Sequence, residues 1–439
     1  MPIDKTVCEL FAGVGGFHVG LSRANAGWNV VVANQWEPSR KLQHAYDCYV
    51  SNFPDTLTLN IDIAKINENP NEYNLPNYNL LVGGFPCQDY SVASTGARGI
   101  EGKKGVLWWE INKMLDRDRP PFVLLENVDR LLKSPSNQRG RDFGVMLGCF
   151  RDLGYSVEWR VINASEYGFA QKRTRIFIFA YLNTTNYYLN QIEELNQNTY
   201  LQERGFFAQQ FPIDSIESTN TYILYDDILT ISNDFKFEFL NSGMMIDNLI
   251  VTQKYKPVLE QPITLGEILE HNVEERYYLG EELGDWEYMK GAKAIPRVSK
   301  DGHEYVFREG AISFPDPLDK PSRTMLTSES SKNRSTHVVR DLETNRLRVL
   351  TPIECERLNG FEDDWTNTGM THKFRYFCMG NALVTGLVER MGVELGEIFD
   401  NENSPIAILT SSHKEFTPQV AVVKYLVPFG LVLTSIAYN

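Results

Sequence analysis

The chain has 439 residues, of which 42% are hydrophobic and 23% charged, and its formal net charge is −14. This length suits two domains or one large domain with insertions, and the composition is ordinary for a globular protein. The acidic balance argues against a polyanionic partner for the surface as a whole. Binding depends on local charge, however, and residues 88–175 hold more Lys and Arg than Asp and Glu, so a basic cleft stays compatible with the sequence.

The six cysteines are scattered and show no CxxC spacing. This usage is typical of a reducing compartment and gives no metal-site signal. The N-terminal stretch MPIDKTVCELFAG lacks the regions of a signal peptide. The apolar tail 421–439 is interrupted by Lys424 and Pro428, and the apolar run that remains is too short to span a bilayer. We therefore expect a cytoplasmic protein without a metal.

Short β-branched runs alternate with helical stretches over the first 180 residues. The runs predict strands over residues 6–13, 28–35, 78–84, 122–128, 155–164 and 175–182. Helices are expected between them, over residues 16–24 and 38–53. Strands that alternate with helices favour right-handed βαβ units, so the sequence predicts an α/β fold with a doubly wound, mostly parallel sheet.

The pattern changes after this region. Residues 185–335 are rich in Asn, Gln, Tyr, Ile and Glu and have poor periodicity, which indicates a smaller, irregular domain. Helical periodicity returns over residues 350–361 and 380–399. We therefore divide the chain into a first domain at 1–184, a second at 185–340, helices at 341–400 that return to the first domain, and a tail at 401–439 of unknown role.

A glycine-rich turn, ELFAGVGGF, closes the first strand and opens a helix. Such a turn lets a ligand approach the helix N-terminus, although it can equally be a structural connection. Its spacing is not GxGxxG, which argues against a nicotinamide oxidoreductase. At the end of the second strand, Gln35 or Glu37 could bind ribose hydroxyls and Trp36 could stack on an adenine. Asp62 could accept from an exocyclic amine or cap a helix.

Cys87 lies in GGFPCQDYS, directly after a predicted strand. Ligands of open α/β sheets bind at the carboxyl ends of strands, and Pro86 restricts where the thiol points. The Gly-rich, basic loop that follows suits phosphate contact. Buried packing is the alternative for this cysteine, but its place at a strand end favours chemistry.

Two further strand ends carry polar residues. Glu126 ends the apolar run FVLLENV, where partial desolvation would raise its pKa and let it donate to a ring nitrogen. In QKRTR, alternate residues share one side of an extended segment, so Gln171, Arg173 and Arg175 point the same way. They could bind a carbonyl and phosphates, or form salt bridges with nearby acids.

The ordered set FAGVGG, PCQ, ENV, QxRxR, LTPxExxRLxGF and a late GN resembles the cytosine-5 DNA methyltransferase family, over residues 5–182 and 345–398. The resemblance implies a Rossmann-like methyltransferase fold that uses S-adenosyl-L-methionine. It makes residues 185–340 a target-recognition domain and double-stranded DNA the partner of a monomer. By family habit, a cognate restriction endonuclease would act separately.

The resemblance also implies the cofactor contacts. They would be Phe11, Ala12, Gly13, Gly15, Gly16, Gln35, Trp36, Glu37, Asp62, Ile63, Pro86, Leu107 and Asn381. One position departs from the family, because an acidic residue commonly precedes the tryptophan and here it is Gln35. The ribose ligand is therefore either Gln35 or Glu37.

The implied mechanism follows the chemistry of cytosine, whose C5 is a weak nucleophile. The Cys87 thiolate would add to C6 of a flipped base, Glu126 would stabilise protonation of N3, and Arg175 with Arg173 would bind O2 or position the loop. C5 then takes the methyl group and elimination releases Cys87. The base that removes the C5 proton is not identified.

DNA contacts are expected from the loop after Cys87, from the QKRTR segment and from the basic, hydroxyl-rich stretch 320–339: Gln88, Ser91, Lys104, Gln171, Arg323, Asn333 and Arg334. The loop 91–105 would close over the flipped base. A solvated surface loop would give the same pattern at 320–339. The rival functions are a tRNA cytosine-5 methyltransferase and an inactive binding protein, and the long second domain favours duplex DNA.

Overall fold

The computed structural model describes residues 3–85, 107–194, 199–299 and 301–403. Its centre is a ten-stranded sheet with the order β3-β2-β1-β4-β5-β7-β6-β9-β10-β8. The strands of this sheet are β1 (Thr6–Leu10), β2 (Asn29–Asn34), β3 (Leu57–Leu59), β4 (Leu80–Gly84), β5 (Phe122–Val128), β6 (Tyr155–Asn163), β7 (Thr174–Leu182), β8 (Ile213–Ile223), β9 (Ser242–Ile246) and β10 (Leu249–Pro257).

The five strands from β3 to β5 run parallel, which confirms the doubly wound, Rossmann-like arrangement. From β7 onward each strand is antiparallel to its neighbour, so the sheet is mixed. All six predicted strands are present. The first ends earlier than predicted, because Phe11 adopts a positive φ of 54° and turns the chain.

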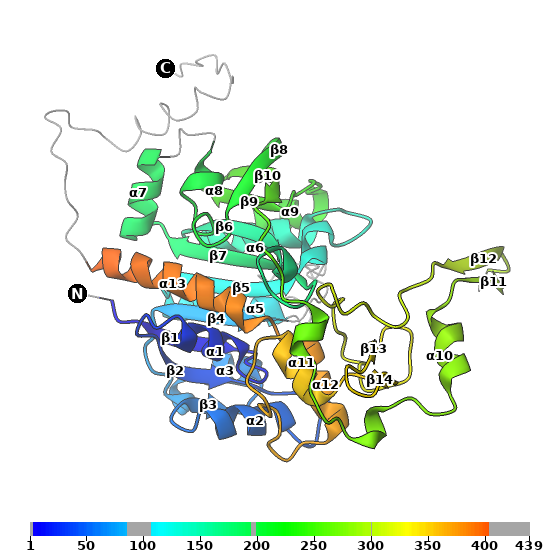
Figure 1. The fold of residues 1–439 in the computed structure, drawn as a ribbon. Helices are drawn as coiled ribbons and strands as arrows, with labels where there is room; N and C mark the ends of the chain where they lie inside the picture. Colours follow the sequence, from blue (N-terminus) through cyan, green and yellow to red (C-terminus); the bar gives the residue numbers. More distant parts are fainter. Residues whose placement is uncertain (1–2, 86–106, 195–198, 300, 404–439) are drawn as a thin grey trace, which may run out of the picture.

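The sheet does not end at the domain boundary expected at residue 184. Strand β9 pairs with β6, and β10 and β8 follow, so residues 213–257 extend the sheet of the first domain (Figure 1). The expectation of a separate, irregular domain from residue 185 is therefore wrong for this part of the segment. Pairing between strands so distant along the chain leaves no local signal in the sequence.

Helices cover both faces of the sheet. The helices are α1 (Gly16–Arg23), α2 (His44–Asn52), α3 (Ile63–Glu68), α4 (Pro70–Tyr73), α5 (Leu107–Asp118), α6 (Arg141–Asp152), α7 (Asn186–Glu194), α8 (Tyr200–Glu203), α9 (Ile228–Asp234), α10 (Leu283–Lys290), α11 (Pro352–Leu358), α12 (His372–Asn381) and α13 (Thr385–Glu402). Four short 3-10 turns are η1 (Asp129–Lys133), η2 (Ala164–Glu166), η3 (Leu265–Ile268) and η4 (Glu275–Tyr277). None of the described helices is long and apolar enough to cross a membrane.

Two predicted helices are shorter than expected. The helix predicted over residues 38–53 begins only at His44, because the Gln43 side chain ties a turn by bonding to both backbone groups of Glu37 and to the Arg40 carbonyl. The helix predicted over residues 380–399 is split, because Ala382 has extended backbone angles between α12 and α13.

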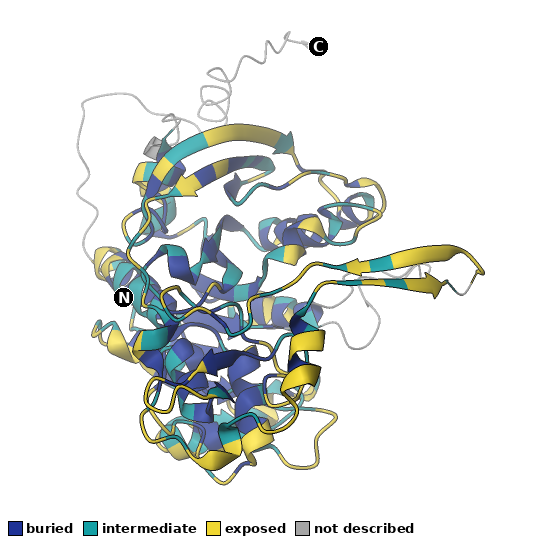
Figure 2. Ribbon diagram, turned by 45° about the vertical axis from the view of Figure 1, so that its right-hand side comes forward, coloured by how far each residue is buried: buried dark blue, intermediate teal, exposed yellow. Residues whose placement is uncertain are grey.

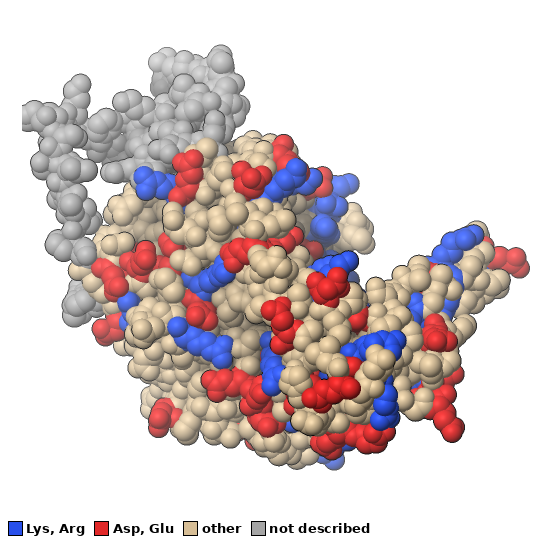
Figure 3. Space-filling view, in the orientation of Figure 1, with Lys and Arg blue, Asp and Glu red and all other residues tan. Residues whose placement is uncertain are grey.

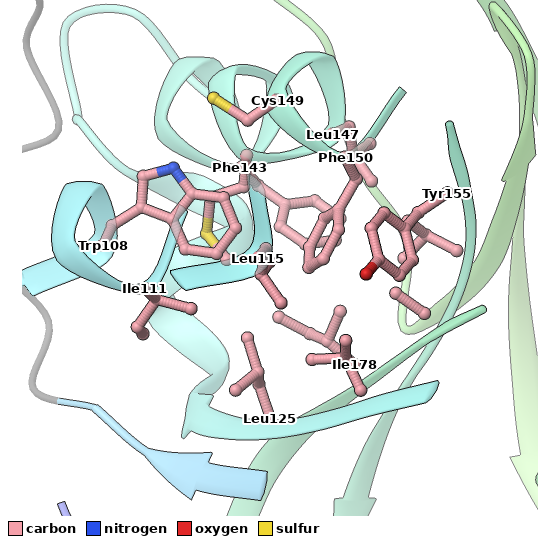
Figure 4. Close-up of a cluster of buried hydrophobic side chains, with 14 of the residues drawn as sticks. Trp108, Ile111, Leu115, Leu125, Phe143, Leu147, Cys149, Phe150, Tyr155 and Ile178 are labelled. Carbon is pink, nitrogen blue, oxygen red and sulfur yellow. The ribbon is translucent and has the colours of Figure 1, made fainter. Parts of the chain in front are cut away.

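Each face of the sheet has its own apolar core. On one face, α5, α6 and α9 pack on the sheet through large side chains such as Trp108, Phe143 and Phe150 (Figure 4). On the other, α1 and the C-terminal helix α13 pack together (Figure 1). A side chain at Gly20 would lie 2.5 Å from Val388 Cβ, so glycine is what lets these two helices approach. The C-terminal helix α13 thus packs against the first helix of the chain.

A projecting arm is formed by residues 283–312. It consists of α10 and a ribbon of two strands, β11 (Lys293–Val298) and β12 (Glu304–Glu309), and Figure 2 shows the ribbon largely exposed. A second small sheet, β13 (Val338–Arg340) with β14 (Leu347–Val349), lies near its base. The arm leaves the body on the side where α11 and α12 lie (Figure 1).

Candidate active site

The glycine-rich turn follows β1 and leads into α1. Phe11, Gly13 and Gly15 all have positive φ angles, and Gly15 is the N-cap of the helix. A Cβ at Gly15 would lie 2.4 Å from the Phe53 ring, so no other residue fits there without displacing that ring. The turn lines a cavity of about 420 Å³, a volume in the range of small-molecule sites.

Gln35 fixes the shape of this turn. Its Oε1 accepts a hydrogen bond from the Gly13 N–H at 2.8 Å, and its carbonyl accepts from Asn60 Nδ2 at 2.7 Å. One lone pair of the Gln35 side-chain oxygen is therefore used, and the residue lines the cavity. Gln35 can still accept one more hydrogen bond at this oxygen and donate from its amide nitrogen.

Glu37 offers a second acceptor group to a ligand in the cavity. It lines the same cavity, and its Oε2 is buried without a hydrogen-bond partner among the described residues. Burial raises the pKa of Glu37, while the positive charges of Arg40 and His44 oppose the shift. A buried carboxylate oxygen with no partner fits a ligand that brings its own hydroxyl donors.

Five of the described residues expected to contact the cofactor do not line this cavity. Asp62 caps α3 by accepting from the Ala64 N–H at 3.0 Å, which is the alternative that the sequence left open. Ile63 is buried in the core, and Trp36 and Leu107 are partly buried. Gly15 also stays outside the lining, whereas Phe11, Ala12, Gly13, Gly16 and Asn381 belong to it.

Glu126 and Arg175 meet in the cavity. Arg175 lies opposite Val128 in the β5–β7 ladder, so its side chain shares a face with Glu126, two residues from Val128. Arg175 Nε is 2.8 Å from Glu126 Oε1, and both side chains are mostly buried. Burial raises the pKa of Glu126, although Arg175 and Arg173 both lower it. The carboxyl group is therefore suited to hold a proton in a site that also carries a fixed positive charge.

Neighbouring backbone makes room for Glu126 and fixes the chain in front of it. Gly84, its partner in β4, leaves space, since a Cβ there would lie 3.1 Å from Glu126 Oε2. The buried Asn127 donates from Nδ2 to the Phe85 carbonyl at 2.8 Å. Phe85 is the last described residue before Pro86, so this bond sets where the chain leaves β4. Pro86, Cys87, Gln88, Ser91 and Lys104 lie outside the described residues.

Arg173 and Gln171 are structural links. Arg173 is 1% exposed, and its guanidinium donates to the carbonyls of Met325 and Gly380. Burial, followed by the charge of Arg175, lowers the pKa of Arg173 to about 9. Gln171 is fully buried and bonds to Asn359 and to the Met325 N–H. The expectation that Gln171 contacts DNA is therefore wrong for this conformation, because its side chain is enclosed by protein.

The three residues predicted to read DNA from the 320–339 stretch are also held by protein. Arg323 forms an ion pair with the buried Asp316 at 2.7 Å. Asn333 accepts from the N–H groups of Ser335 and Thr336. Arg334 donates to a set of backbone carbonyls at the base of the arm: Met289, Lys290, Gly291 and Gly310. The structure thus gives this stretch a supporting role.

Several cavity residues were not anticipated from the sequence: Val14, Phe17, Ala45, Gly84, Phe85, Asn127, Val128, Phe377, Cys378, Gly380, Ala382 and Leu383. The cavity residues around Asn381 close the site from the end of α12. The only sequence feature that indicated them was the late GN pair. Within the described residues, no group of His, Cys, Asp and Glu side chains could hold a metal ion.

Similarity to known proteins identifies the family of this chain. A family model for C-5 cytosine-specific DNA methylases matches residues 5–397. The type II methyltransferase M.Sau3AI of Staphylococcus aureus is 51% identical over 89% of this chain and 95% of its own length. M.SsoII of Shigella sonnei is 24% identical over 90% of this chain and 80% of its own length.

Solved structures share the fold. A Spodoptera frugiperda DNMT2 structure superposes with a TM-score of 0.55 at 15% identity, covering 90% of this chain and 99% of that one. The Dnmt2 methyltransferase of S. pombe gives 0.53 at 16% identity, covering 91% and 99%. The family match spans both the glycine-rich turn and the Glu126–Arg175 pair. The chain therefore belongs to the C-5 cytosine-specific DNA methylases and is a DNA cytosine-5 methyltransferase.

Proposed function

We propose that this chain is the modification enzyme of a type II restriction–modification system, and that it methylates C5 of a cytosine flipped out of duplex DNA. The observation that carries the chemistry is the Glu126–Arg175 pair, which shares one cavity with the glycine-rich turn. The type II assignment rests on the similarity to M.Sau3AI over nearly its whole length. A cognate endonuclease would act as a separate protein, and both would work in the cytoplasm.

The cofactor is proposed to be S-adenosyl-L-methionine. The residues present fit this group, because Glu37 Oε2 is an unpartnered acceptor for ribose hydroxyls and Gln35 can donate from its amide. Phe11 offers a ring beside the turn, and Gly13 and Gly16 keep the wall free of side chains. When bound, the cofactor would supply the electrophilic methyl group. We assign the ribose contact to Glu37, since its Oε2 has no partner among the described residues, whereas the Gln35 oxygen already accepts from the Gly13 N–H.

Cys87 is proposed as the nucleophile toward C6 of cytosine. Addition of a thiolate to C6 places electron density on C5, which is otherwise too weak a nucleophile to attack a methyl group. Asn127 supports the role by fixing the backbone carbonyl of Phe85, two residues before Cys87. After methyl transfer, loss of the C5 proton and elimination would release the thiol.

Glu126 and Arg175 are proposed to stabilise the negative charge that builds on the cytosine ring. A protonated Glu126 can donate to N3 as charge builds on the ring, and its raised pKa favours that state. The guanidinium of Arg175 would bind O2 and keep Glu126 oriented. Arg173 would support the position of this pair through its hydrogen bonds to the carbonyls of Met325 and Gly380. Residues 185–340 are proposed to recognise the target sequence.

Two experiments test the proposal. Bisulfite sequencing of DNA from a host that expresses the protein should show cytosine methylation within one short sequence. Label transferred only to tRNA, in a parallel assay on DNA and tRNA, would refute the DNA assignment in favour of the tRNA enzyme. Purified protein should also form a covalent adduct with DNA that carries 5-fluorocytosine. An adduct that survives Cys87→Ser would rule out the proposed nucleophile.

A further inference from the structure

The ribbon β11–β12 stands clear of the body. Its two strands pair with each other and, among the described residues, with no other strand. Figures 1 and 3 show it at the end of the arm, with Lys and Arg side chains along the arm and acidic side chains among them. An isolated two-stranded ribbon is only marginally stable in water. A ribbon of this kind is therefore expected to be completed by a partner.

The two faces of the ribbon differ in chemistry. Residues directly opposite each other share a face, so Arg297 and Tyr305 lie together, next to the pair Ile295 and Phe307. Lys293 and Glu309 complete this face nearer the body. The opposite face is made of the remaining pairs: Ala294 with Arg308, Pro296 with Val306, and Val298 with Glu304. One face is thus cationic and aromatic, and the other is mainly apolar.

On the first face, the side chain of Arg297 packs against an aromatic ring. Its guanidinium lies over the Phe307 ring, with the Cζ atom 3.9 Å from the ring centroid. Arg297 is itself exposed, so the fork of N–H donors points to solvent around its edges. Among the described pairs of the ribbon, the only carboxylate on this face is that of Glu309, which lies beside Lys293 and Arg334, at 3.9 and 4.0 Å. Arg297 therefore has no acidic partner on its own face.

The base of the ribbon is fixed to the body by polar contacts. Arg334 donates to the carbonyls of Met289 and Gly291 before β11 and to that of Gly310 after β12, so one side chain holds both ends. The buried Lys290 donates to the Thr336 carbonyl. Desolvation lowers the pKa of Lys290 to about 8. These contacts set the direction of a ribbon that has no apolar core of its own.

The same base is connected to the catalytic cavity. The Lys172 N–H donates to the Ser322 carbonyl at 2.8 Å, and Ser322 bonds to the buried His337. Arg173 links Met325, in the same stretch, to Gly380 of the cavity wall. These hydrogen bonds therefore connect the attachment point of the ribbon to the residues that would act on the flipped cytosine.

We propose that the ribbon β11–β12 enters the major groove of DNA and that Arg297 reads the edge of a guanine in the target sequence. This inference rests on the proposed function. The major groove admits a two-stranded ribbon, and a bidentate contact from Arg to O6 and N7 of guanine is the commonest specific one. The stacked, exposed guanidinium of Arg297 has the planar fork that this contact needs. Arg334 is the positioning residue that aims the ribbon.

The test compares two arginines on opposite faces of one ribbon. In Arg297→Gln, kcat/KM for target DNA should fall about ten- to a hundredfold, and bisulfite maps should show that one base position of the target has become relaxed. Arg297→Lys keeps the charge but not the fork, so it should relax the same position while leaving the salt dependence of binding nearly unchanged. KM for the cofactor and the thermal midpoint should stay as in the parent.

Arg308→Gln is the matched control, because it removes the same charge from the other face. It should change kcat/KM for DNA by less than about threefold and leave the methylated sequence intact. The inference is overturned if Arg297→Gln methylates the same sites with unchanged efficiency, or if Arg308→Gln costs as much. Absence of DNA methylation by the parent enzyme would instead reject the proposed function, so the two failures are distinguishable.

Discussion

Two regions carry the polar residues that mark a DNA-acting enzyme, yet they use them differently: the sheet edge formed by the carboxyl ends of β4 and β5 with the amino end of β7, and the stretch 320–339. At the strand ends, Glu126 and Arg175 pair with each other inside a cavity. In the stretch 320–339, Arg323, Asn333 and Arg334 bond to a buried carboxylate and to backbone groups. The first set remains accessible to a ligand within the cavity, and the second is used to hold the chain in place.

The difference follows from where backbone hydrogen bonds are made. Strands satisfy their N–H and C=O groups in the ladder, so polar side chains at their ends are left for chemistry. An irregular segment has no ladder, and its backbone groups must be satisfied by side chains or water. Basic, amide and hydroxyl residues in such a segment are therefore first candidates for support, even where their composition resembles that of a nucleic-acid contact.

The largest effect is expected at the strand ends, from Glu126→Gln. The substitution keeps the size of the side chain but removes the proton that its raised pKa favours. We expect kcat to fall by about a hundredfold to ten-thousandfold, with little change in cofactor affinity. Steady-state methylation of a defined DNA duplex measures this. Glu68→Gln, an exposed position on α3, is the control and should leave kcat unchanged.

A second prediction compares packing in the cavity wall with packing in the arm, through one glycine of each. A Cβ at Gly380, in the cavity wall, would lie 2.4 Å from the Thr327 backbone nitrogen, which cannot move aside easily. Gly380→Ala should therefore lower the free energy of unfolding by roughly 3 kcal/mol. Gly284, in α10 of the arm, has nothing within 4 Å of the corresponding position. Gly284→Ala should raise the stability slightly, because it improves an exposed helix.

Denaturant unfolding of both variants, followed by circular dichroism, checks this pair. Equal losses of stability from the two substitutions would mean that the arm around Gly284 is packed as tightly as the cavity wall around Gly380, against this prediction.

A third prediction concerns a carboxyl group in the parallel half that the proposed mechanism does not use. Glu9 is fully buried on β1 and accepts from the Tyr49 hydroxyl at 2.8 Å. Desolvation raises its pKa to about 8, above the ordinary 4.5. The folded protein therefore keeps a proton that the unfolded chain loses, and the stabilising effect of this proton declines as pH rises from about 4.5 to about 8.

Glu9→Gln isolates this effect, because the amide mimics the protonated acid at every pH. The difference in free energy of unfolding between the variant and the parent should grow in favour of the variant by about 2 kcal/mol from pH 6 to pH 7.5. Chemical unfolding at several pH values measures the difference. A constant difference across that range would show that Glu9 is ionised in the folded protein.

The strand ends and the stretch 320–339 also differ in how well the sequence predicts their structure. The strand ends were predictable because a run such as FVLLENV places Glu126 at the end of a strand by its own local pattern. The role of Arg334 was not, because its partners are backbone carbonyls 24 to 45 residues away, which no side-chain pattern reveals. The pairing of β9 with β6 was missed for a related reason: the strands are far apart in the chain, and their contact depends on tertiary packing.

The smallest expected effect tests the supporting role of the 320–339 stretch directly, at Asn333. Its Oδ1 accepts from the Ser335 and Thr336 N–H groups at 2.7 and 3.2 Å, and its Nδ2 donates to the Ser328 and Ser331 carbonyls. Asn333→Ala should lower the free energy of unfolding by about 1 kcal/mol. Asn333→Asp retains the acceptor, so it should be the more stable variant of the two.

The same pair of variants separates support from DNA contact. If Asn333 touched DNA, the new negative charge in Asn333→Asp would weaken DNA binding well below that of Asn333→Ala, and most strongly at low salt. A supporting residue predicts the reverse order, with Asn333→Asp closer to the parent in both stability and DNA affinity. Fluorescence anisotropy with a labelled duplex at several salt concentrations decides between the two orders, because only a direct contact makes the gap between the variants shrink as salt is raised.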